Sequence, residues 1–259
     1  MSDLVSPVVE IVEAAGRRIM EIYERGFETT LKADNSPLTE ADLASHHLIV
    51  EGLTALDASI PILSEEAASI PYEERKGWKR FWLVDPLDGT KEFVNRTGEF
   101  TVNIALIEDG EPTMGVVGTP PLGLTYIGDS SGAFRIDADG KRPIHCREYT
   151  GGPVGVVASR SHAGAETEAW LEKLRAIYPE VDLVSKGSSL KFCLVAEGSA
   201  HVYPRLGPTM EWDIAAAYAV VKAAGATITN FDGNALAFNK EDLHNPFFLV
   251  RAPGLQVPS

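Results

Sequence analysis

Cysteine is scarce in this sequence. The chain of 259 residues contains only two, Cys146 and Cys193, which lie far apart. Two distant cysteines form no disulfide framework, so we expect a cytoplasmic protein with reduced thiols, and we expect Cys193 to lie in the core. Because 44% of the residues are hydrophobic, the chain can bury a substantial core without cross-links.

Long apolar runs are also absent. No stretch of about 18 apolar residues occurs, so we expect no helix that spans a membrane. The N-terminal segment MSDLVSPVVEIVEAAGRR has an early acidic residue and an amphipathic pattern, which differs from a secretory signal. Low-complexity stretches are missing as well, which excludes a mainly disordered chain.

Basic residues are outnumbered. The chain has 23 Lys plus Arg against 37 Asp plus Glu, which gives a formal net charge of −14. A protein that binds nucleic acid neutralises phosphates with a basic face, so we expect no nucleic-acid partner. The surplus of carboxylates suits a protein that gathers acids around cations, but net charge alone does not identify one.

The first half of the chain predicts two helices and then an antiparallel meander. The pair Ser6 and Pro7 gives the first helix a cap and a first-turn proline, and Gly26 ends it. Thr39 and Asp42 form a capping box that opens the second helix. From residue 100 the apolar pattern changes to a period of two, and short strands separated by Gly and Pro turns follow.

The second half alternates strands and helices. Helices are expected near residues 166–177, 190–197 and 213–224, with strands near 154–157, 181–184 and 201–203 and two more close to 226 and 247. We therefore expect an α+β protein of layered helices and sheets in two closely packed lobes, residues 1–150 and 151–259.

The segment WLVDPLDGT, residues 82–90, places two aspartates directly after an apolar run. Pro86 forces a turn, so Asp85 and Asp88 can point into one space while the Leu87 carbonyl faces outward. Hard divalent cations prefer such oxygen ligands. The segment therefore predicts a metal site, and an ordinary surface turn explains the same pattern equally well.

The same segment ends with Gly89 and Thr90, which offer two consecutive backbone N–H groups. Such a pair can receive a phosphate oxygen. Further acids stand at the ends of other predicted elements, namely Glu65, Asp213 and Asp42. Each has its own structural explanation, respectively a solvated loop, the helix dipole and the capping box. One site that gathers all these carboxylates explains them more simply.

Two segments resemble the signatures of the inositol monophosphatase superfamily, whose members are Mg²⁺-dependent and often lithium-sensitive phosphatases. They are DPLDGT at 85–90 and WDIAA at 212–216, and the resemblance covers nearly the whole chain. Finer motifs resemble the 3′(2′),5′-bisphosphate nucleotidase branch. These motifs are at 34–39, 41–42, 63–66, 88–93, 98–104, 159–162, 187–193 and 203–205.

The resemblance implies an αβαβα-layered sugar-phosphatase fold that binds two to three Mg²⁺ ions. Glu65, Asp85 and the Leu87 carbonyl would hold one ion, and Asp85, Asp88 and Asp213 would hold a second. A third ion would contact Glu65 through water. One metal would activate a water molecule, and the other would stabilise the leaving oxygen.

By the same resemblance, Asp42 and Thr90 would orient and deprotonate the attacking water, and the amides of Gly89 and Thr90 would receive the scissile phosphate. The residues that would contact the rest of the substrate are His162, Ser188, Lys191, Arg205 and Asp213. Plain structural explanations stand beside three of these: a turn for His162, a solvated helix start for Lys191 and a surface loop for Arg205.

The implied activity is hydrolysis of the 3′-phosphate of adenosine 3′,5′-bisphosphate to AMP and phosphate, with the sulfated form of this nucleotide as a further substrate. An inositol or other sugar monophosphatase is one alternative, and a Mg²⁺-dependent regulatory protein that binds without catalysis is another. A homodimer and a peripheral association with the inner membrane also stay open. The chain departs from relatives at Ala217, where Gly is common, and at Glu211, an extra acid near the expected metals.

Overall fold

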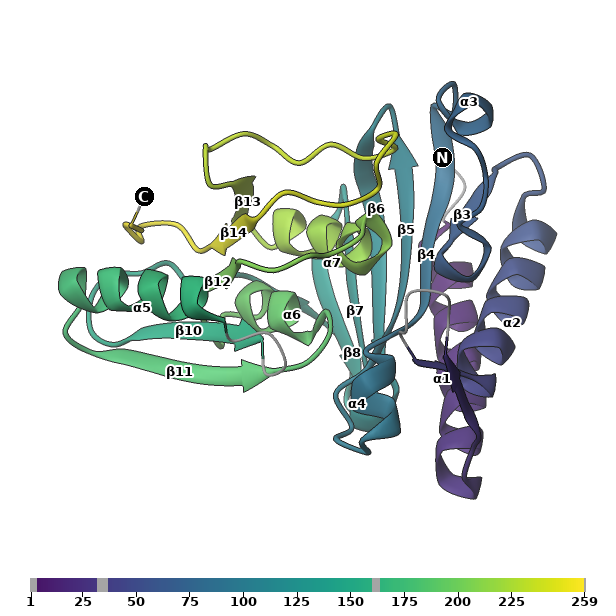
Figure 1. Cartoon of the computed structure of the whole chain (residues 1–259), viewed down its shortest axis with the longest axis horizontal. Helices are drawn as coiled ribbons and strands as arrows, with labels where there is room; N and C mark the ends of the chain where they lie inside the picture. The colour runs from purple at the N-terminus through teal and green to yellow at the C-terminus, as the bar shows by residue number, and fades with distance from the viewer. Residues whose placement is uncertain (1–3, 32–36, 160–163, 259) are drawn as a thin grey trace.

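The computed structural model describes residues 4–31, 37–159 and 164–258. Helices and sheets alternate in five layers, α/β/α/β/α (Figure 1). The expected layered α+β fold is therefore confirmed. No helix in these described ranges is long and apolar enough to cross a bilayer.

The outer helical layer consists of α1 (Val5–Arg25) and α2 (Glu40–Leu56). One face of α1 is buried, as the spacing predicts. The expected cap at Ser6 was wrong, because the cap residue is Leu4 and the helix begins at Val5, two residues earlier than expected. Pro7 is then the third helical residue, where a backbone N–H has no partner within the helix, so the proline costs no hydrogen bond. Gly26 ends α1 with a φ of 91°, as expected.

A seven-stranded sheet forms the second layer, in the order β3-β4-β5-β6-β7-β8-β9. Only the β3–β4 pair is parallel, and the rest is the expected meander. The strands are β3 (Ile62–Ser64), β4 (Arg80–Asp88), β5 (Thr101–Glu108), β6 (Glu111–Thr119), β7 (Leu124–Asp129), β8 (Gly132–Asp137) and β9 (Gly140–Ile144).

The middle layer is formed by α6 (Leu190–Ala196) and α7 (Glu211–Ala223), which lie between the two sheets (Figure 1). Helix α7 packs very closely on β6 and β7. A Cβ atom added at Gly115 would lie 2.0 Å from the carbonyl oxygen of Ala216, and one at Gly128 would lie 2.4 Å from Cα of Val220. These two glycines therefore let the backbone of α7 contact the sheet closely along the middle of the helix.

The second sheet has five strands in the order β11-β10-β12-β14-β13. Helix α5 (Ala165–Ile177) covers its outer face, where a separate apolar cluster forms. The strands are β10 (Val154–Ser159), β11 (Val181–Lys186), β12 (Val202–Arg205), β13 (Thr227–Asn230) and β14 (Phe248–Arg251). A boundary at residue 150 would fall between β9 and β10, and the division into two lobes stays a prediction.

The remaining elements are short and connect the layers. They are the hairpin of β1 (Thr29–Leu31) and β2 (Pro37–Thr39), the 3-10 helices η1 (Glu65–Ala67) and η2 (Pro120–Leu122), and the helices α3 (Tyr72–Arg75) and α4 (Thr90–Val94). The element η1 follows β3 directly, and α4 follows β4, so both lie where these two parallel strands end at the same edge of the sheet.

Candidate active site

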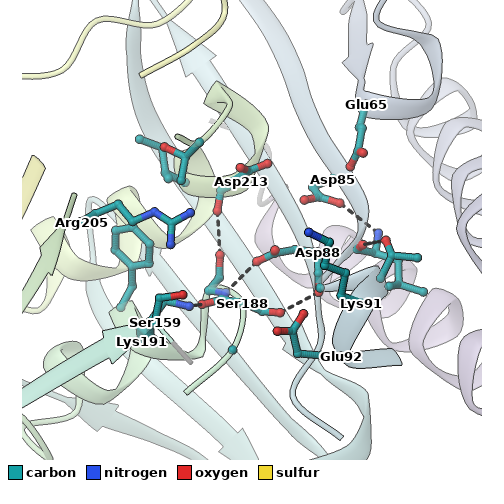
Figure 2. Close-up of a pocket in the computed structure, with 18 of the residues that line it drawn as sticks. Glu65, Asp85, Asp88, Lys91, Glu92, Ser159, Ser188, Lys191, Arg205 and Asp213 are labelled. Atoms are coloured by element: carbon teal, nitrogen blue, oxygen red, sulfur yellow. Dashed lines mark hydrogen bonds between the residues drawn. The ribbon is translucent and has the colours of Figure 1, made fainter. Parts of the chain in front are cut away.

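A cavity of about 270 Å³ opens where β4 ends and where α4, α6 and α7 begin (Figure 2). Most of the residues that the sequence predicted for the site line this cavity. They are Glu65, Asp85, Leu87, Asp88, Gly89, Thr90, Ser188, Lys191, Arg205 and Asp213. His162 lies outside the described residues, and Asp42 lies behind the wall, in contact with Thr90.

The first aspartate pair stands on a bulge at the end of β4. Asp85 pairs with Asn103 and Asp88 with Thr101, so β4 has one more residue than β5 over this stretch. The expected turn at Pro86 was wrong in form, because the strand continues through the proline to Asp88. An extra residue in one strand disrupts the ladder locally, which tolerates a proline and turns both carboxylates towards the cavity.

The carboxylates repel one another. Asp85 is 1% exposed, and burial, followed by the nearby Glu65, Asp88 and Asp213, holds its pKa well above the usual value. Burial and the charge of Asp88 likewise raise the pKa of Asp213. Burial also raises the pKa of Asp88, which Lys191 and the Ser189 N–H partly offset. Lys191 next to Asp88 and Arg205 next to Asp213 compensate this negative charge only in part, since the pKa values of both aspartates stay raised.

This donor set fits a hard divalent cation. It offers three aspartates and one glutamate, whose side chains lie around one cavity (Figure 2), and Leu87 lines the same cavity and has a backbone carbonyl to offer. In the described part of the chain, no three His, Cys, Asp or Glu side chains are already drawn together as a metal centre. A bound cation would relieve the repulsion between these acids.

Asp42 and Thr90 are paired, as expected. The Thr90 hydroxyl donates to Asp42 Oδ1 at 3.0 Å. The other carboxylate oxygen accepts from both the N–H and the hydroxyl of Thr39, which is the predicted capping box at the start of α2. The pKa of Asp42 is raised, because desolvation by burial outweighs these hydrogen bonds. Of the two carboxylate oxygens of Asp42, only Oδ1 is therefore connected to the cavity, through the Thr90 hydroxyl.

Gly89 brings the two halves of the chain together. It adopts a φ of 94°, which favours glycine, and a Cβ atom there would lie 2.1 Å from Ser188 Oγ. The Ser188 hydroxyl lies 2.8 Å from the carbonyl oxygens of both Asp88 and Glu99. Ser188 thus lines the cavity as predicted, but its hydroxyl is directed at backbone carbonyls of the first half.

Two cationic side chains form the wall opposite the acids. Lys191 is 4% exposed, donates to the Ser188 carbonyl at 2.6 Å, and has its pKa lowered to about 8, chiefly by burial. Arg205 is 8% exposed and donates to the Pro208 carbonyl at 2.7 Å. The explanations as a solvated helix start and a surface loop were therefore wrong. Figure 2 shows both residues on the wall across from Asp85 and Glu65.

Several lining residues were not singled out from the sequence. They are Pro37, Lys91, Glu92, Ser159, Gly187, Ser189, Phe192, Tyr203, Pro208, Thr209 and Ile214. Most of them lie inside the motifs that carry the resemblance, and membership of these motifs is the only sequence feature that could have indicated them. Cys193 is fully buried, as expected, and His46 contacts the Ser64 hydroxyl rather than a group of acids.

Glu211 serves the fold and does not reach the carboxylate cluster. It is fully buried and accepts from the N–H of Asn239 at 2.6 Å, from the N–H of Lys240 at 3.0 Å and from Lys240 Nζ at 2.6 Å. The loop at 239–240 is thereby held against the first turn of α7, two residues before Asp213.

We expect Glu211→Gln to lower the free energy of unfolding by about 3 kcal/mol, because it leaves the Lys240 charge and a backbone N–H without their partner. Urea denaturation measures this loss. The matched control is Glu111→Gln, which breaks an exposed ion pair with Lys222 and should cost at most about 1 kcal/mol. Equal losses in the two variants would contradict the role assigned to Glu211.

Comparison with known proteins supports these observations. A model of the inositol monophosphatase family matches residues 1–252. The 3′(2′),5′-bisphosphate nucleotidase CysQ of Escherichia coli (strain K12) is 45% identical over 250 residues, which cover 95% of this chain and 99% of that protein. The CysQ nucleotidase of Haemophilus influenzae is 38% identical over 253 residues, which cover 95% of this chain and 92% of that protein.

Solved structures agree with the sequence matches. CysQ from Bacteroides thetaiotaomicron, described as a bacterial member of the inositol monophosphatase family, has a TM-score of 0.85 and 40% identity, with 97% of each chain covered. Inositol monophosphatase from Anabaena has a TM-score of 0.76 at 22% identity, with 96% of this chain and 90% of that chain covered. At this lower identity, the second structure shows the shared fold alone.

Proposed function

This chain belongs to the inositol monophosphatase family, and from that premise we propose that it is a magnesium-dependent 3′(2′),5′-bisphosphate nucleotidase. It would hydrolyse the 3′-phosphate of adenosine 3′,5′-bisphosphate to AMP and phosphate, and would act on the sulfated form of this nucleotide as well. The reduced, unpaired state of Cys146 and Cys193 supports a cytoplasmic location.

The observation that carries this proposal is the division of the cavity into an acidic wall and a cationic wall. The acidic wall presents Glu65, Asp85, Asp88 and Asp213, and Lys191 and Arg205 lie across from Glu65 and Asp85 (Figure 2). Lys91, a third cation of the lining, lies near Asp88. A substrate with one phosphate needs only the first wall. The fixed positive charges of Lys191 and Arg205 suit a substrate that carries a second anionic group, as a bisphosphate does.

Glu65, Asp85, Asp88, Asp213 and the Leu87 carbonyl would hold two or three Mg²⁺ ions. When bound, such ions lower the pKa of a coordinated water molecule and neutralise charge on the phosphate and on the leaving oxygen. The protein residues do the rest of the work around that centre: they place the water, take up its proton, and hold both ends of the substrate.

Asp42 and Thr90 form the proton path. The Thr90 hydroxyl donates to Asp42 Oδ1, so its own lone pairs are free to orient a water molecule in the cavity. A proton that leaves the water towards Thr90 can be matched by transfer of the Thr90 proton to Asp42 Oδ1. Because burial raises the pKa of Asp42, this carboxylate is a better base than an ordinary aspartate.

A substrate comparison tests the proposal. Phosphate release from adenosine 3′,5′-bisphosphate, 3′-AMP and inositol 1-phosphate is measured with purified protein, with and without MgCl₂. We expect release only with Mg²⁺ and a kcat/KM for the bisphosphate at least about tenfold above that for 3′-AMP. A preference for inositol 1-phosphate would indicate a sugar monophosphatase. Mg²⁺ binding without any hydrolysis would indicate a regulatory protein.

Replacing the cationic wall should change substrate choice. We expect Lys191→Ala and Arg205→Ala each to lower kcat/KM for the bisphosphate by a factor that corresponds to about 1.5–3 kcal/mol of transition-state stabilisation. The reason is that each removes a charge-assisted hydrogen bond to the phosphate that is not cleaved. Turnover of 3′-AMP should barely change. Steady-state kinetics on both substrates measure the difference.

Arg205→Lys is the conservative comparison in this series. It should recover only part of the loss, because a single ammonium group cannot replace a planar guanidinium that binds with two parallel hydrogen bonds. If the two Ala variants instead lower turnover of all phosphate esters equally, Lys191 and Arg205 serve the common chemistry or the fold. The bisphosphate preference would then need another explanation.

A further inference from the structure

Ser189 joins two acids that come from different parts of the chain. Its backbone N–H donates to Asp88 Oδ2 at 2.7 Å, and its hydroxyl donates to the backbone carbonyl of Asp213 at 2.7 Å. Ser189 is the residue directly before α6 and is 1% exposed. One buried residue of the second half therefore ties the end of β4 to the first turn of α7.

Asn103 orients the hydroxyl of Ser189. It lies on β5 opposite Asp85, and its Nδ2 is 3.2 Å from Ser189 Oγ. A hydroxyl has one proton, and the Asp213 carbonyl must receive it because a carbonyl can only accept. Ser189 Oγ therefore accepts from Asn103, which fixes the amide with its NH₂ group towards Ser189.

The carbonyl oxygen of the Asn103 side-chain amide, Oδ1, differs from its NH₂ group in its surroundings. Asn103 is 1% exposed, and its Oδ1 has no hydrogen-bond partner among the described residues. A buried acceptor without a donor destabilises the fold, and its neighbours on β5, Val102 and Ile104, are apolar and fully buried. An apolar residue at position 103 would therefore give a more stable fold, unless the NH₂ group of Asn103 is needed to donate to Ser189.

We propose that Asn103 and Ser189 form a positioning relay that fixes Asp88 relative to Asp213 and so prepares the cavity to bind a divalent cation. This inference rests on the proposed function, because the cation is the one that the function requires. Both are positioning residues, since the Ser189 hydroxyl is held by Asn103 and Asp213. Loss of a group that hydrogen-bonds to a metal ligand typically weakens metal binding 10- to 100-fold.

The relay can be tested without substrate. The melting temperature of the full chain is measured over a series of MgCl₂ concentrations, and Mn²⁺ binding is followed by EPR. For Ser189→Ala we expect the Mg²⁺ concentration that gives half of the stabilisation to rise about tenfold, and the dissociation constant for Mn²⁺ to rise similarly, because Asp213 loses its link to Asp88.

Thr119→Val is the matched control. The Thr119 hydroxyl is also buried and donates to a backbone carbonyl, that of Leu124, at 3.0 Å, but Thr119 does not line the cavity. This variant should melt at a lower temperature at every Mg²⁺ concentration, while the half-stabilising Mg²⁺ concentration stays at the wild-type value. The control thus separates a weaker fold from a weaker cation site.

Asn103→Leu provides a second variant in case Ser189→Ala does not fold. It keeps the branching at Cγ and removes the donor, so we expect a several-fold rise in the half-stabilising Mg²⁺ concentration. The double variant should bind Mg²⁺ no more weakly than Ser189→Ala alone, because both changes act through one hydroxyl.

The outcomes separate this inference from the proposed function. If the wild-type protein shows no stabilisation by Mg²⁺ and no Mn²⁺ binding, the proposed metal site itself is wrong, and the relay falls with it. If the wild-type protein responds, and Ser189→Ala and Asn103→Leu respond at the same concentrations, the relay alone is overturned. A rise in both variants but not in Thr119→Val supports it.

Discussion

Asp85→Asn is expected to abolish nearly all phosphatase activity and to leave the fold intact. Asp85 is the one side chain proposed to contact both principal cations, so its loss affects both the activation of water and the stabilisation of the leaving oxygen. We expect kcat/KM for adenosine 3′,5′-bisphosphate to fall by several orders of magnitude at saturating MgCl₂. Near-wild-type turnover would contradict the assignment of Asp85.

The same variant should be more stable than the wild-type protein in metal-free buffer. Burial and the neighbouring acids raise the folded-state pKa of Asp85 above its unfolded value, so the folded state binds the extra proton more readily. Ionisation of Asp85 therefore opposes folding, and stability falls as the pH rises through the window above the unfolded pKa. Asp85→Asn removes that penalty at neutral pH.

Addition of MgCl₂ should reverse this order. With the proposed site, the wild-type protein should gain stability from bound cation, whereas Asp85→Asn should gain much less. Asp129→Asn is the matched control, because Asp129 accepts hydrogen bonds from Ser131 in a turn and does not line the cavity. It should keep both the wild-type activity and the wild-type response to MgCl₂.

The parts of the site that the sequence predicted are those that depend on neighbours in the chain. The capping box of Thr39 and Asp42 spans three residues, and the structure forms it as expected. The cluster at Asp85 and Asp88 follows an apolar run, and strand β4 does deliver both to the cavity. Local order was enough here because hydrogen bonds over three residues and strand ends are properties of short segments.

Other parts of the site depend on contacts that no short segment contains. Pro86 favoured a turn, but pairing with β5 over the bulge keeps the strand extended. Lys191 and Arg205 were expected to be solvated on local grounds, yet packing between the sheets buries both. The acceptor role of Glu211 depends on a loop almost thirty residues further along the chain. Tertiary packing determines the burial and the partners of such residues, and these contacts cannot be read from the pattern of a single sequence.

Asp42→Asn is the second change with a large expected effect. In the variant, the amide oxygen can still accept both hydrogen bonds from Thr39, which leaves the NH₂ group facing Thr90. An NH₂ group donates to the Thr90 hydroxyl and cannot take its proton, so the proton path is reversed at that point. Loss of a general base lowers the rate by about 10²–10⁴.

Kinetics and melting together decide what Asp42 does. If it takes the proton from Thr90, kcat for Asp42→Asn falls by that factor while the melting temperature changes little, since the cap is kept. If it only caps α2, activity stays within a few-fold, and Asp42→Ala loses about 1 kcal/mol of stability with no further loss of rate. The two roles share one carboxylate but use different oxygens, Oδ1 for Thr90 and Oδ2 for Thr39, so the amide separates them where a truncation to alanine cannot.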